Sequence, residues 1–511
     1  MRERALITLH PLPEAVNFFM ISRFSTCTNW ASSFTPFLLD FQQWLINRNV
    51  GIYVVGGFVR DLYLGRGPKD LDLLVDGDVE YLGHDIARTF GGVFIKPGDR
   101  YSVVKIVFES HGLSLDLTSL KTTLQENLRA RDFTIDALAL PIQDLTRADW
   151  KSFVIDFTGG VEDLSRKLIK IAGASVIELD PLRMLRAVRL AKELDFTLET
   201  TTESYIKKYS SCIDLVATER IRDEFLAILS LNDSKDSLSK LDDLGLLCRI
   251  IPELHFAKEV DQPREHYWDV FNHTIESVGE VELITDRHET KQSICDVYWD
   301  DRIEEYFRWP LTLGYDRRTF VKLGALFHDI GKPYTKTNDE FGRIRFLGHD
   351  KRGAAIAGRR MKLLRFSSKA IKFVELMVGH HLRPFQLTNS SNLPARKAVY
   401  RLYRDLGIEA TGILFFGLAD YRAARGPLMD IEDWEHKVEI VNHALVTYKE
   451  WNKKIKEARL LTGHDLINIF RIEPGPQFGP LLDGVEDAWL SGAIRTRKDA
   501  MGWVRGRLNI K

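Results

Sequence analysis

Three aspartates near the start of the chain have a spacing that suits metal-assisted phosphoryl chemistry. Asp70 and Asp72 are separated by one leucine, so on a strand both carboxylates point to one face and the neighbouring leucines to the other. Asp116 also alternates with leucines, in LSLDL, and is expected on the polar face of another strand. Such carboxylates suit two Mg²⁺ ions, about 3.5–4 Å apart, that clamp the attacking and leaving oxygens of a phosphoryl displacement. A solvated edge strand would expose Asp70 and Asp72 equally well.

A glycine pair precedes these aspartates. The segment GIYVVGGFVRDLYLG, residues 51–65, predicts a strand, a turn at Gly56 and Gly57, and a helix that begins near Phe58. Glycines allow a ligand to approach the backbone closely, and the N–H groups at a helix N-terminus favour a phosphate there. Arg60, one helical turn further, could reach the same anion. A glycine pair alone is also typical of a plain turn.

The elements that position these residues form a small α/β head. Residues 36–49 have apolar side chains at helical spacing, and β-branched or alternating runs predict strands at 52–55, 71–75, 102–108 and 113–117. From about residue 162 onward, long helical periods dominate. We therefore predict an α+β multidomain chain, with a mixed sheet and helices in the head and an all-helical remainder.

A series of motifs resembles those of the bacterial-type, class II tRNA nucleotidyltransferases and the related poly(A) polymerases. GGFVRD followed by KDLDLLV resembles the first motif. The next ones are ARDFTIDALAL at 130–140, FTGGVEDLSRKLIKIAG at 157–173, DPLRMLRAVRLAKELDF at 180–196 and TERIRDEFLAIL at 218–229. The resemblance implies a nucleotidyltransferase head followed by a helical neck.

The resemblance also assigns roles to the matching positions. Asp70 and Asp72, with Asp116, would be the catalytic carboxylates that hold Mg²⁺. The residues implied in nucleotide binding are Gly56, Gly57, Arg60, Arg131, Asp132, Asp180, Arg183, Arg186 and Arg189.

The fourth motif has two interpretations. In the family it acts as an amino-acid template, so Asp180 and Arg183 would hydrogen-bond the base edge. Arg183, Arg186 and Arg189 follow at spacings of three and share a drifting helical stripe, which fits contact with one elongated ligand. By itself, Asp180 before Pro181 is typical of a helix N-cap with proline at the first helical position. With the resemblance, we favour base recognition.

Departures from the family pattern bear on nucleotide choice. The usual Asn of the second motif is Asp136 here, and the usual Glu before the fourth-motif Asp is Leu179; neither removes a metal ligand. Full CCA-adding members carry a long flexible loop between the metal-binding strands and the second motif, whereas here only residues 117–130 lie there. This short segment resembles the CC-adding branch. Addition of CCA and addition of CC alone both stay open, with poly(A) polymerase as a further alternative.

Histidines in the second half occur in an order that resembles the HD phosphohydrolase superfamily, a helical fold that binds one or two divalent ions. The core ligands implied by this resemblance are His273, His328, Asp329 and Asp420. The candidates for a second ion are His349, His380 and His381. A divalent transition metal or Mg²⁺ would serve hydrolysis of an RNA-end phosphate, such as a 2′,3′-cyclic phosphate, a 2′-nucleotide or a 3′-phosphate.

Motifs and turn-rich joints divide the chain into five parts. They are an N-terminal extension (1–35), the nucleotidyltransferase head (36–160), a helical neck and body for nucleotide and RNA binding (161–262), an HD domain (263–430) and a helical C-terminal tail (431–511). The segment 460–504 resembles the one that follows the HD region in such enzymes. Residues 1–35 match no motif.

Composition excludes several other classes of protein. The 511 residues are 44% hydrophobic and 28% charged, an ordinary globular balance. No apolar stretch is long enough to cross a membrane, and no secretory signal begins the chain, so we expect a cytoplasmic protein. The four cysteines show no CxxC spacing and are expected as free thiols. Because the net charge is -1, RNA binding requires local patches such as 351–372, where basic residues occur without an acidic one.

Together these features predict template-independent transfer of nucleotides from CTP and ATP to the 3′ end of tRNA, with release of pyrophosphate. We expect tRNA to be held through its phosphates and shape, with salt-sensitive and largely sequence-tolerant binding. Two rivals are a non-catalytic RNA-binding module and a protein whose principal activity is hydrolysis at the HD site.

Overall fold

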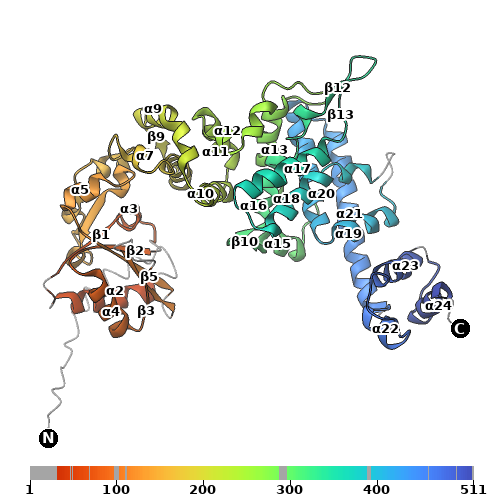
Figure 1. The fold of residues 1–511 in the computed structure, drawn as a ribbon, viewed down its shortest axis with the longest axis horizontal. Helices are drawn as coiled ribbons and strands as arrows, with labels where there is room; N and C mark the ends of the chain where they lie inside the picture. The colour runs from red at the N-terminus through yellow and green to blue at the C-terminus, as the bar shows by residue number, and fades with distance from the viewer. Residues whose placement is uncertain are drawn as a thin grey trace, which may run out of the picture. The chain divides into compact units, whose positions relative to one another are not determined.

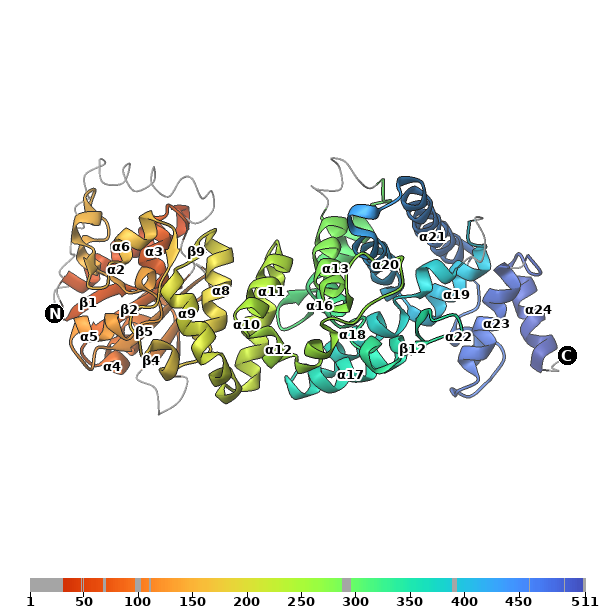
Figure 2. The same cartoon turned by 90° about the horizontal axis from the view of Figure 1, so that it is seen from above.

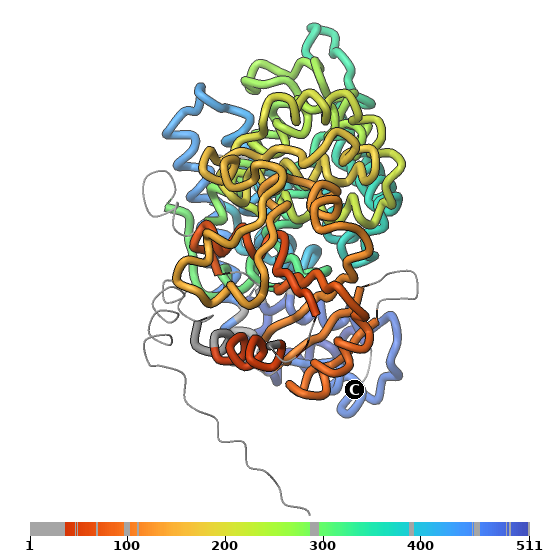
Figure 3. Tube along the Cα trace, turned by 90° about the vertical axis from the view of Figure 1, so that its left-hand side faces the viewer, coloured from red at the N-terminus to blue at the C-terminus, as the bar shows by residue number. Residues whose placement is uncertain are grey.

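The computed structural model describes residues 31–46, 48, 50–67, 70–96, 103–109, 112–286, 296–387, 393–458, 460–490 and 492–508. The chain forms two compact units, Met1–Val216 and Ala217–Lys511. Figures 1 and 2 label their elements, and Figure 3 traces the backbone in chain order by colour. Most of the proposed N-terminal extension lies outside the described residues.

A mixed seven-stranded sheet forms the centre of the first unit. Its strands lie in the order β3-β4-β5-β2-β1-β6-β7. Only β2 and β5 pair in parallel among these described strands; the other neighbours are antiparallel. The strands are β1 Gly51–Val55, β2 Asp70–Asp76, β3 Val93–Ile95, β4 Val103–Phe108, β5 Leu113–Ser119, β6 Leu138–Pro141 and β7 Ile155–Asp156. This arrangement confirms the mixed sheet expected from the alternating runs.

Helices α2 (Ala31–Ile46) and α4 (Val79–Phe90) pack against one face of this sheet (Figure 1). Phe37 of α2 contacts Phe90 of α4 and Phe108 of β4, with ring centroids 5.4 and 4.9 Å apart. The limits of α4 follow from local chemistry, because Asp78 accepts backbone N–H bonds at its start and Gly91 adopts φ 75° at its end. The aromatic cluster therefore packs on the face of the sheet that carries Leu71 and Leu73 of β2.

The rest of the first unit carries the later motifs on short elements beside the sheet. These are α3 Gly57–Tyr63, α5 Leu124–Arg129, η2 Thr134–Asp136, α6 Gly160–Ser165, α7 Val176–Leu179, α8 Arg183–Leu194 and α9 Thr200–Tyr209. In α8, Met184, Leu185 and Val188 are buried. Their burial leaves the arginines of this helix on its more exposed side.

The second unit is built from packed helices. They are α10 Thr218–Ser230, α11 Ser234–Asp243, α12 Leu247–Ile250, α13 Val270–Thr285, α15 Asp301–Arg308, α16 Arg317–Phe327, α17 His349–Leu363, α18 Ser368–His380, α19 Arg396–Leu406, α20 Glu409–Arg425, α21 Ile431–Ala458, α22 Gly463–Asn468, α23 Phe478–Leu490 and α24 Arg497–Leu508. Helix α13 packs against α16 and α20, and α18 packs against α16 and α17 (Figure 2). The last three helices enclose a core of their own that includes Leu466, Val485 and Val504.

The remainder is largely helical, but the expectation of an all-helical remainder was wrong in detail. Short strands pair at β8–β9 (Leu168–Ile169 and Thr197–Leu198), β10–β11 (Pro310–Thr312 and Tyr315–Asp316) and β12–β13 (Lys336–Asn338 and Ile344–Phe346). Gly314 and Gly342 adopt φ 79° and 75° in the two hairpin turns, so the chain reverses tightly between helices. None of the helices in the described ranges is long and apolar enough to span a bilayer.

Candidate functional site

The three aspartates of the head lie side by side on β2 and β5, the parallel pair of strands in the described sheet. Asp72 is the register partner of Asp116, and Asp70 is that of Ser114. Leu71 and Leu73 are buried on the opposite face, as the alternation predicted. The Ser114 hydroxyl donates to Asp70 Oδ1 at 2.8 Å, and Lys105 Nζ lies 3.3 Å from Asp116. Burial, together with the charges of Asp116 and Asp70, raises the pKa of Asp72 to about 6 despite nearby Arg131.

The glycine turn is shaped by an arginine of the second motif. Gly56 adopts φ +74°, and a Cβ atom placed there would lie 2.7 Å from Arg131 Nη1 and 3.4 Å from Asp72 Oδ2. Arg131 Nε is buried without a hydrogen-bond partner among the described residues. Burial lowers the pKa of Arg131, although the charge of Asp72 opposes this. Gly56 is therefore required as much by the approach of Arg131 as by the turn itself.

Arg60 is placed beneath this surface and already has partners. Only 7% of Arg60 is exposed, and it donates to Asp136 Oδ1 at 2.7 Å and to Asp61 Oδ1 at 2.8 Å. Burial alone would lower the pKa of Arg60, but the charge of Asp136 raises it above its usual value. Burial raises the pKa of Asp136, because it disfavours the charged carboxylate. The sequence showed Asp136 only as a departure from Asn, and the structure shows it to be the buried partner of Arg60.

The predicted nucleotide-binding residues of the second and fourth motifs converge. Arg186 Nε lies 2.9 Å from Asp132 Oδ2, which joins α8 to the second motif. Arg183 donates to the carbonyl oxygens of Val176 and Ala130 at 3.1 and 3.2 Å. Arg183 thereby joins the start of α8 to α7 and to the end of α5.

The two ends of the proposed template stripe differ. Asp180 Oδ1 accepts the backbone N–H of Leu182 at 3.3 Å, but α8 begins at Arg183 with Leu182 as its N-cap, so the expectation of Asp180 as the N-cap was wrong. Arg189 Nη1 lies 2.6 Å from Glu193 one turn along α8. The carboxylate strands, Gly56, Arg131 and the start of α8 thus form one polar surface, and Gly57 adjoins it at the start of α3.

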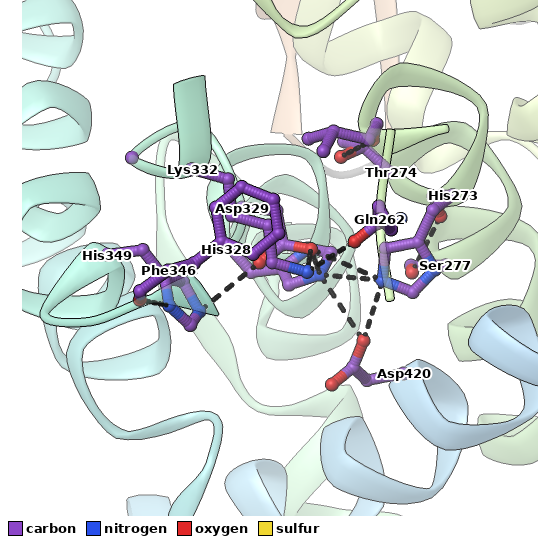
Figure 4. Close-up of polar contacts among 12 residues, drawn as sticks. Gln262, His273, Thr274, Ser277, His328, Asp329, Lys332, Phe346, His349 and Asp420 are labelled. Carbon is purple, nitrogen blue, oxygen red and sulfur yellow. Dashed lines mark hydrogen bonds and ion pairs between the residues drawn. The ribbon is translucent and has the colours of Figure 1, made fainter. Parts of the chain in front are cut away.

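The second unit holds a buried cluster of histidines and aspartates (Figure 4). His273 comes from α13, His328 and Asp329 follow α16, and Asp420 comes from α20. His273 Nε2 lies 2.9 Å from Asp420 Oδ1 and 3.1 Å from His328 Nε2. His328 Nε2 lies 3.0 Å from Asp329 Oδ2. The structure therefore brings together all four residues expected as core ligands.

A second group shares Asp329 with the first. His349 Nε2 lies 3.2 Å from His381 Nε2 and 3.4 Å from Asp329 Oδ1. His381 is 2% exposed and faces His349, whereas His380 is outside this group in the described structure. Of the two adjacent histidines, the structure thus selects His381. Asp329, with one oxygen toward each group, lies between them.

The hydrogen bonds of the rings suit a metal site. Nδ1 of His328, His349 and His381 each lies 2.7 Å from the carbonyl oxygen three residues earlier, so Nδ1 carries the proton and the Nε2 lone pairs face one another. Asp329 is buried, and its two oxygens face ring nitrogens of both groups, Oδ2 towards His328 at 3.0 Å and Oδ1 towards His349 at 3.4 Å. Inward-facing imidazole nitrogens and carboxylate oxygens are the donor set that a divalent cation satisfies.

Charges of the cluster support the same conclusion. Burial would lower the pKa of His328, but the adjacent Asp329 and Asp420 carboxylates raise it to about 10. Burial lowers the pKa of His381 to about 4, with the charge of His328 adding to the effect. Two buried carboxylates thus draw positive charge to Nε2 of His328, which carries a proton in the absence of a cation and would lose it to free its lone pair for a metal ion.

Sequence reasoning missed several neighbours of this cluster. Lys332 Nζ lies 2.6 Å from Asp329 Oδ2 and donates to Gln262 Oε1 at 2.6 Å. Lys332 follows Asp329 by three residues in HDIGKP, so helical spacing could have found it. Gly331 lies against the carbonyl oxygen of His349, where a Cβ atom would clash. No spacing in the sequence indicated Gln262, because it comes from a loop.

Three family models match segments of the chain that include most residues of the two sites. The poly A polymerase head domain matches residues 52–123 and 114–170. The probable RNA and SrmB-binding site of polymerase A matches 195–258, and the HD domain matches 270–413. The matched regions include the carboxylate strands and most of the histidine cluster.

Whole-length relatives differ in the nucleotide named for them. The CC-adding tRNA nucleotidyltransferase of Thermus thermophilus is 29% identical, over 88% of this chain and 92% of that protein. The A-adding tRNA nucleotidyltransferase of Deinococcus radiodurans is 28% identical, over 89% and 95%. A solved structure described as a CCA-adding enzyme in apo form I has the same fold, with a TM-score of 0.62 over 95% of this chain and 97% of the other, at 20% identity.

Proposed function

The chain belongs to the family of class II tRNA nucleotidyltransferases and poly(A) polymerases with head, RNA-binding and HD domains, and on this premise we propose that it extends the 3′ end of tRNA from CTP. The observation that carries the proposal is the register pairing of Asp72 with Asp116 beside Asp70. Three adjacent carboxylates, of which Asp72 has a raised pKa, match the demand of a divalent cation for oxygen ligands.

The head residues have separate tasks in this proposal. When bound, Mg²⁺ supplies activation of the attacking hydroxyl and stabilisation of the leaving pyrophosphate. Asp70, Asp72 and Asp116 hold the ions. Arg131, buried against Gly56, offers the triphosphate a positive charge and an N–H that has no partner among the described residues. Arg60, bonded to Asp136, supports the glycine turn from below instead of contacting phosphate.

Base selection is proposed to lie on α8. Asp180 and Arg183 present hydrogen-bonding groups at its start, and Arg183 is fixed by two carbonyl oxygens. The Asp132–Arg186 ion pair sets the position of α8 against the second motif. Preorganised donors of this kind would recognise a base edge without a nucleic-acid template.

A specific observation favours CC addition over complete CCA addition. Residues 117–130, which replace the family's long loop, finish β5 and fold into α5, whose Thr123–Glu126 capping box fixes its start. The resemblance links that loop to the change from CTP to ATP. We therefore propose that this chain stops after two cytidines, while ATP use remains the alternative to be tested. The two whole-length relatives above are a CC-adding and an A-adding enzyme, so identity to them does not decide the nucleotide.

One assay tests the reaction and its nucleotide choice together. Three tRNA transcripts, ending before CCA, after C and after CC, are each offered CTP, ATP or both with Mg²⁺, and products are separated at single-nucleotide resolution. Two cytidines without adenosine support CC addition. Two cytidines followed by one adenosine identify a complete CCA-adding enzyme, and one adenosine on the CC-ended transcript without any cytidine addition identifies an A-adding enzyme. Long adenosine tails identify a poly(A) polymerase.

Variants of β2 locate the reaction. Asp72→Asn is expected to lower kcat at least 100-fold, because it removes a charged metal ligand. Asp76→Asn is a matched control at the exposed end of the same strand. Full activity of Asp72→Asn would contradict the head as the site of transfer.

We further propose that the HD site is a metal-dependent phosphohydrolase. His273, His328, Asp329 and Asp420 would hold one ion, and Asp329, His349 and His381 a second, as their donor atoms allow. When bound, the ions would supply an activated water for attack on a phosphate ester. The donor geometry supports this activity in addition to transfer.

The HD proposal is tested on RNA ends that carry a 2′,3′-cyclic phosphate or a 3′-phosphate, with Mg²⁺, Mn²⁺, Co²⁺ or Ni²⁺ supplied. His328→Ala combined with Asp329→Ala is expected to abolish hydrolysis while nucleotide addition continues. Metal content of the purified protein gives a second readout. Absence of bound metal and of hydrolysis in the wild type would overturn the proposal.

A further inference from the structure

A cavity in the second unit lies outside both proposed sites. It has a volume of about 200 Å³ and is lined by α19, α21 and α23, and α19 contacts both other helices. Its aromatic lining consists of Tyr400, Tyr448, Trp451 and Trp489. A closed apolar cavity of about 150 Å³ holds one benzene ring, so this volume fits a single one- or two-ring heterocycle.

One side chain in the lining has an unmet hydrogen bond. Trp451 Nε1 is buried and has no partner among the described residues. Its ring is held by aromatic neighbours, with centroids 5.1 Å from Tyr400 and 5.6 Å from Tyr448. Because a buried N–H without an acceptor costs about 1–3 kcal/mol, the ligand that completes this cavity should offer an acceptor atom.

The charges of the lining argue against a cationic ligand. Glu450 is exposed and lies 4.0 Å from the guanidinium of Arg396. Tyr400 Oη donates to Glu486 at 3.0 Å. The lining thus carries one carboxylate and one cation, and an ammonium group would leave the indole N–H unpaired because it offers no acceptor.

Helix α19, which contributes Arg396 and Tyr400 to the lining, is basic. Helix α19 carries exposed Arg396, Lys397, Arg401 and Arg404 against one acid, Asp405. Cations beside aromatic faces are the combination that binds a nucleic-acid backbone while a base stacks. Arg396 is the cation in the lining and suits a phosphate, while the aromatic side chains suit a flat ring with acceptor atoms.

We propose that the cavity between α19, α21 and α23 binds one nucleobase, with Trp451 Nε1 donating to a ring nitrogen or carbonyl oxygen of the base and Arg396 holding its phosphate. The base could belong to an unpaired nucleotide of RNA or to a free nucleotide. The RNA source rests on the proposed function; the free-nucleotide source does not.

Two arms test the proposal on the full-length protein. In the first, anisotropy measures binding of a tRNA transcript over a range of salt concentrations. In the second, ligand-observed NMR measures binding of AMP and CMP. Trp451→Phe keeps the ring and removes the donor, whereas Trp451→Ala removes both. Trp309→Phe, at a 54% exposed tryptophan of the same unit, is the matched control.

We expect Trp451→Phe to weaken binding about 3- to 10-fold and Trp451→Ala about 5- to 100-fold. In the RNA arm, the weakening should be equal at every salt concentration, since stacking releases no counterions and leaves the slope against salt unchanged. Ultraviolet cross-linking with peptide mapping should place the base on the segment that contains Trp451. Weaker binding in one arm alone identifies the source of the base.

Unchanged binding of Trp451→Phe in both arms, or a weakening no larger than that of Trp309→Phe, would overturn the proposal. Failure of this proposal and failure of the proposed function are distinguishable. A protein that extends tRNA normally while both arms stay unchanged loses only the cavity site. If the protein adds no nucleotide but binds AMP or CMP through Trp451, the proposed function fails and the nucleobase site in the cavity stands.

Discussion

At the scale of single residues, the two sites use opposite ways of holding charge. In the head, Asp72 and Asp116 are pressed together by strand register, and the pKa of Asp72 rises through burial and like charge. In the HD cluster, Nδ1–H bonds to the backbone fix the rings of His328 and His349 before any ligand arrives. A cation bound in the head would therefore reduce the repulsion between carboxylates. A cation bound in the HD cluster would be coordinated by imidazole rings that are already oriented.

The approach of Arg131 to Gly56 gives a prediction at this scale. Gly56→Ala should destabilise the protein by about 1–3 kcal/mol, because φ 74° with ψ -143° is a conformation that residues with a Cβ atom rarely adopt, and it should also abolish nucleotide addition by displacing Arg131. Gly65→Ala is the matched control, because Gly65 has φ +71° but open space around its Cβ position. Urea unfolding and the addition assay check both variants. Equal activity of the two would contradict the assigned contact.

At the scale of elements, a buried ion pair joins helices of the second unit. Lys322 of α16 is 2% exposed and donates to Glu282 of α13 at 2.7 Å. Glu282 also accepts from the hydroxyl of Ser234 at the start of α11 at 2.6 Å. Burial lowers the pKa of Lys322, although Glu282 opposes it. This network fixes α13, which carries His273, relative to α16, which precedes His328.

Removing one charge of this pair should lower the free energy of unfolding more than expected from its share when both charges are removed. Lys322→Met leaves the Glu282 charge buried without its partner and should destabilise by about 3–5 kcal/mol. Lys322→Met combined with Glu282→Gln should cost less than the sum of the two single changes, because no uncompensated charge remains. Urea unfolding of all four proteins gives the coupling. Strict additivity would show that the pair is not a unit.

The cap of α15 predicts a pH dependence. Burial would raise the pKa of Asp300, but bonds from Arg302, Lys449 and the Ile303 backbone N–H lower it to about 2. A pKa below the unfolded value of about 3.9 means that the carboxylate stabilises the fold above that pH, and this is lost as pH falls toward about 2. Asp300→Asn should therefore cost about 1 kcal/mol at pH 7 and progressively less below pH 4.

The check is urea unfolding between pH 7 and pH 3. Asp301→Asn, at the exposed neighbouring position, serves as the control and should differ little from wild type at any pH. A destabilisation by Asp300→Asn that stays constant over this range would contradict the assigned role of its charge.

At the scale of the whole molecule, net charge is -1, so attraction for RNA must come from local surfaces. Helices α17 and α18 carry exposed cations that form no ion pair with an acidic residue in the described ranges, at Lys351, Arg359, Lys362, Lys369 and Lys372. This surface belongs to the same unit as the HD cluster. Phosphate contacts made there would contribute affinity without sequence preference.

Neutralising two of these cations tests the surface. Lys369→Gln with Lys372→Gln should weaken tRNA binding and reduce the slope of log affinity against log salt by about 0.9 for each phosphate that the variant no longer neutralises. Lys437→Gln is the control, since Lys437 lies 3.4 Å from Asp433 and its charge is already paired. Anisotropy titrations at several salt concentrations measure both slopes. Identical slopes in wild type and double variant would exclude this surface from RNA binding.

The sequence alone determined the features that depend on short-range periodicity and spacing. Alternation within β2 placed Asp70 and Asp72 on one face, and the run around Asp116 predicted β5. The order of the histidine motifs indicated an HD domain, which the family comparison confirms. Such features are local, because the two-residue repeat of a strand and the spacing of residues along a helix are properties of the chain itself.

Only the tertiary structure decided which distant residues meet. His381 and not His380 faces His349, because the direction of a ring at the end of α18 is set by packing against α17 and by its Nδ1 bond to Val378. Arg60 is paired with Asp136 across 76 positions of the chain, so its reach toward a phosphate could not be judged from spacing. Burial and long-range pairing depend on the whole packed chain, and local sequence carries no direct record of either.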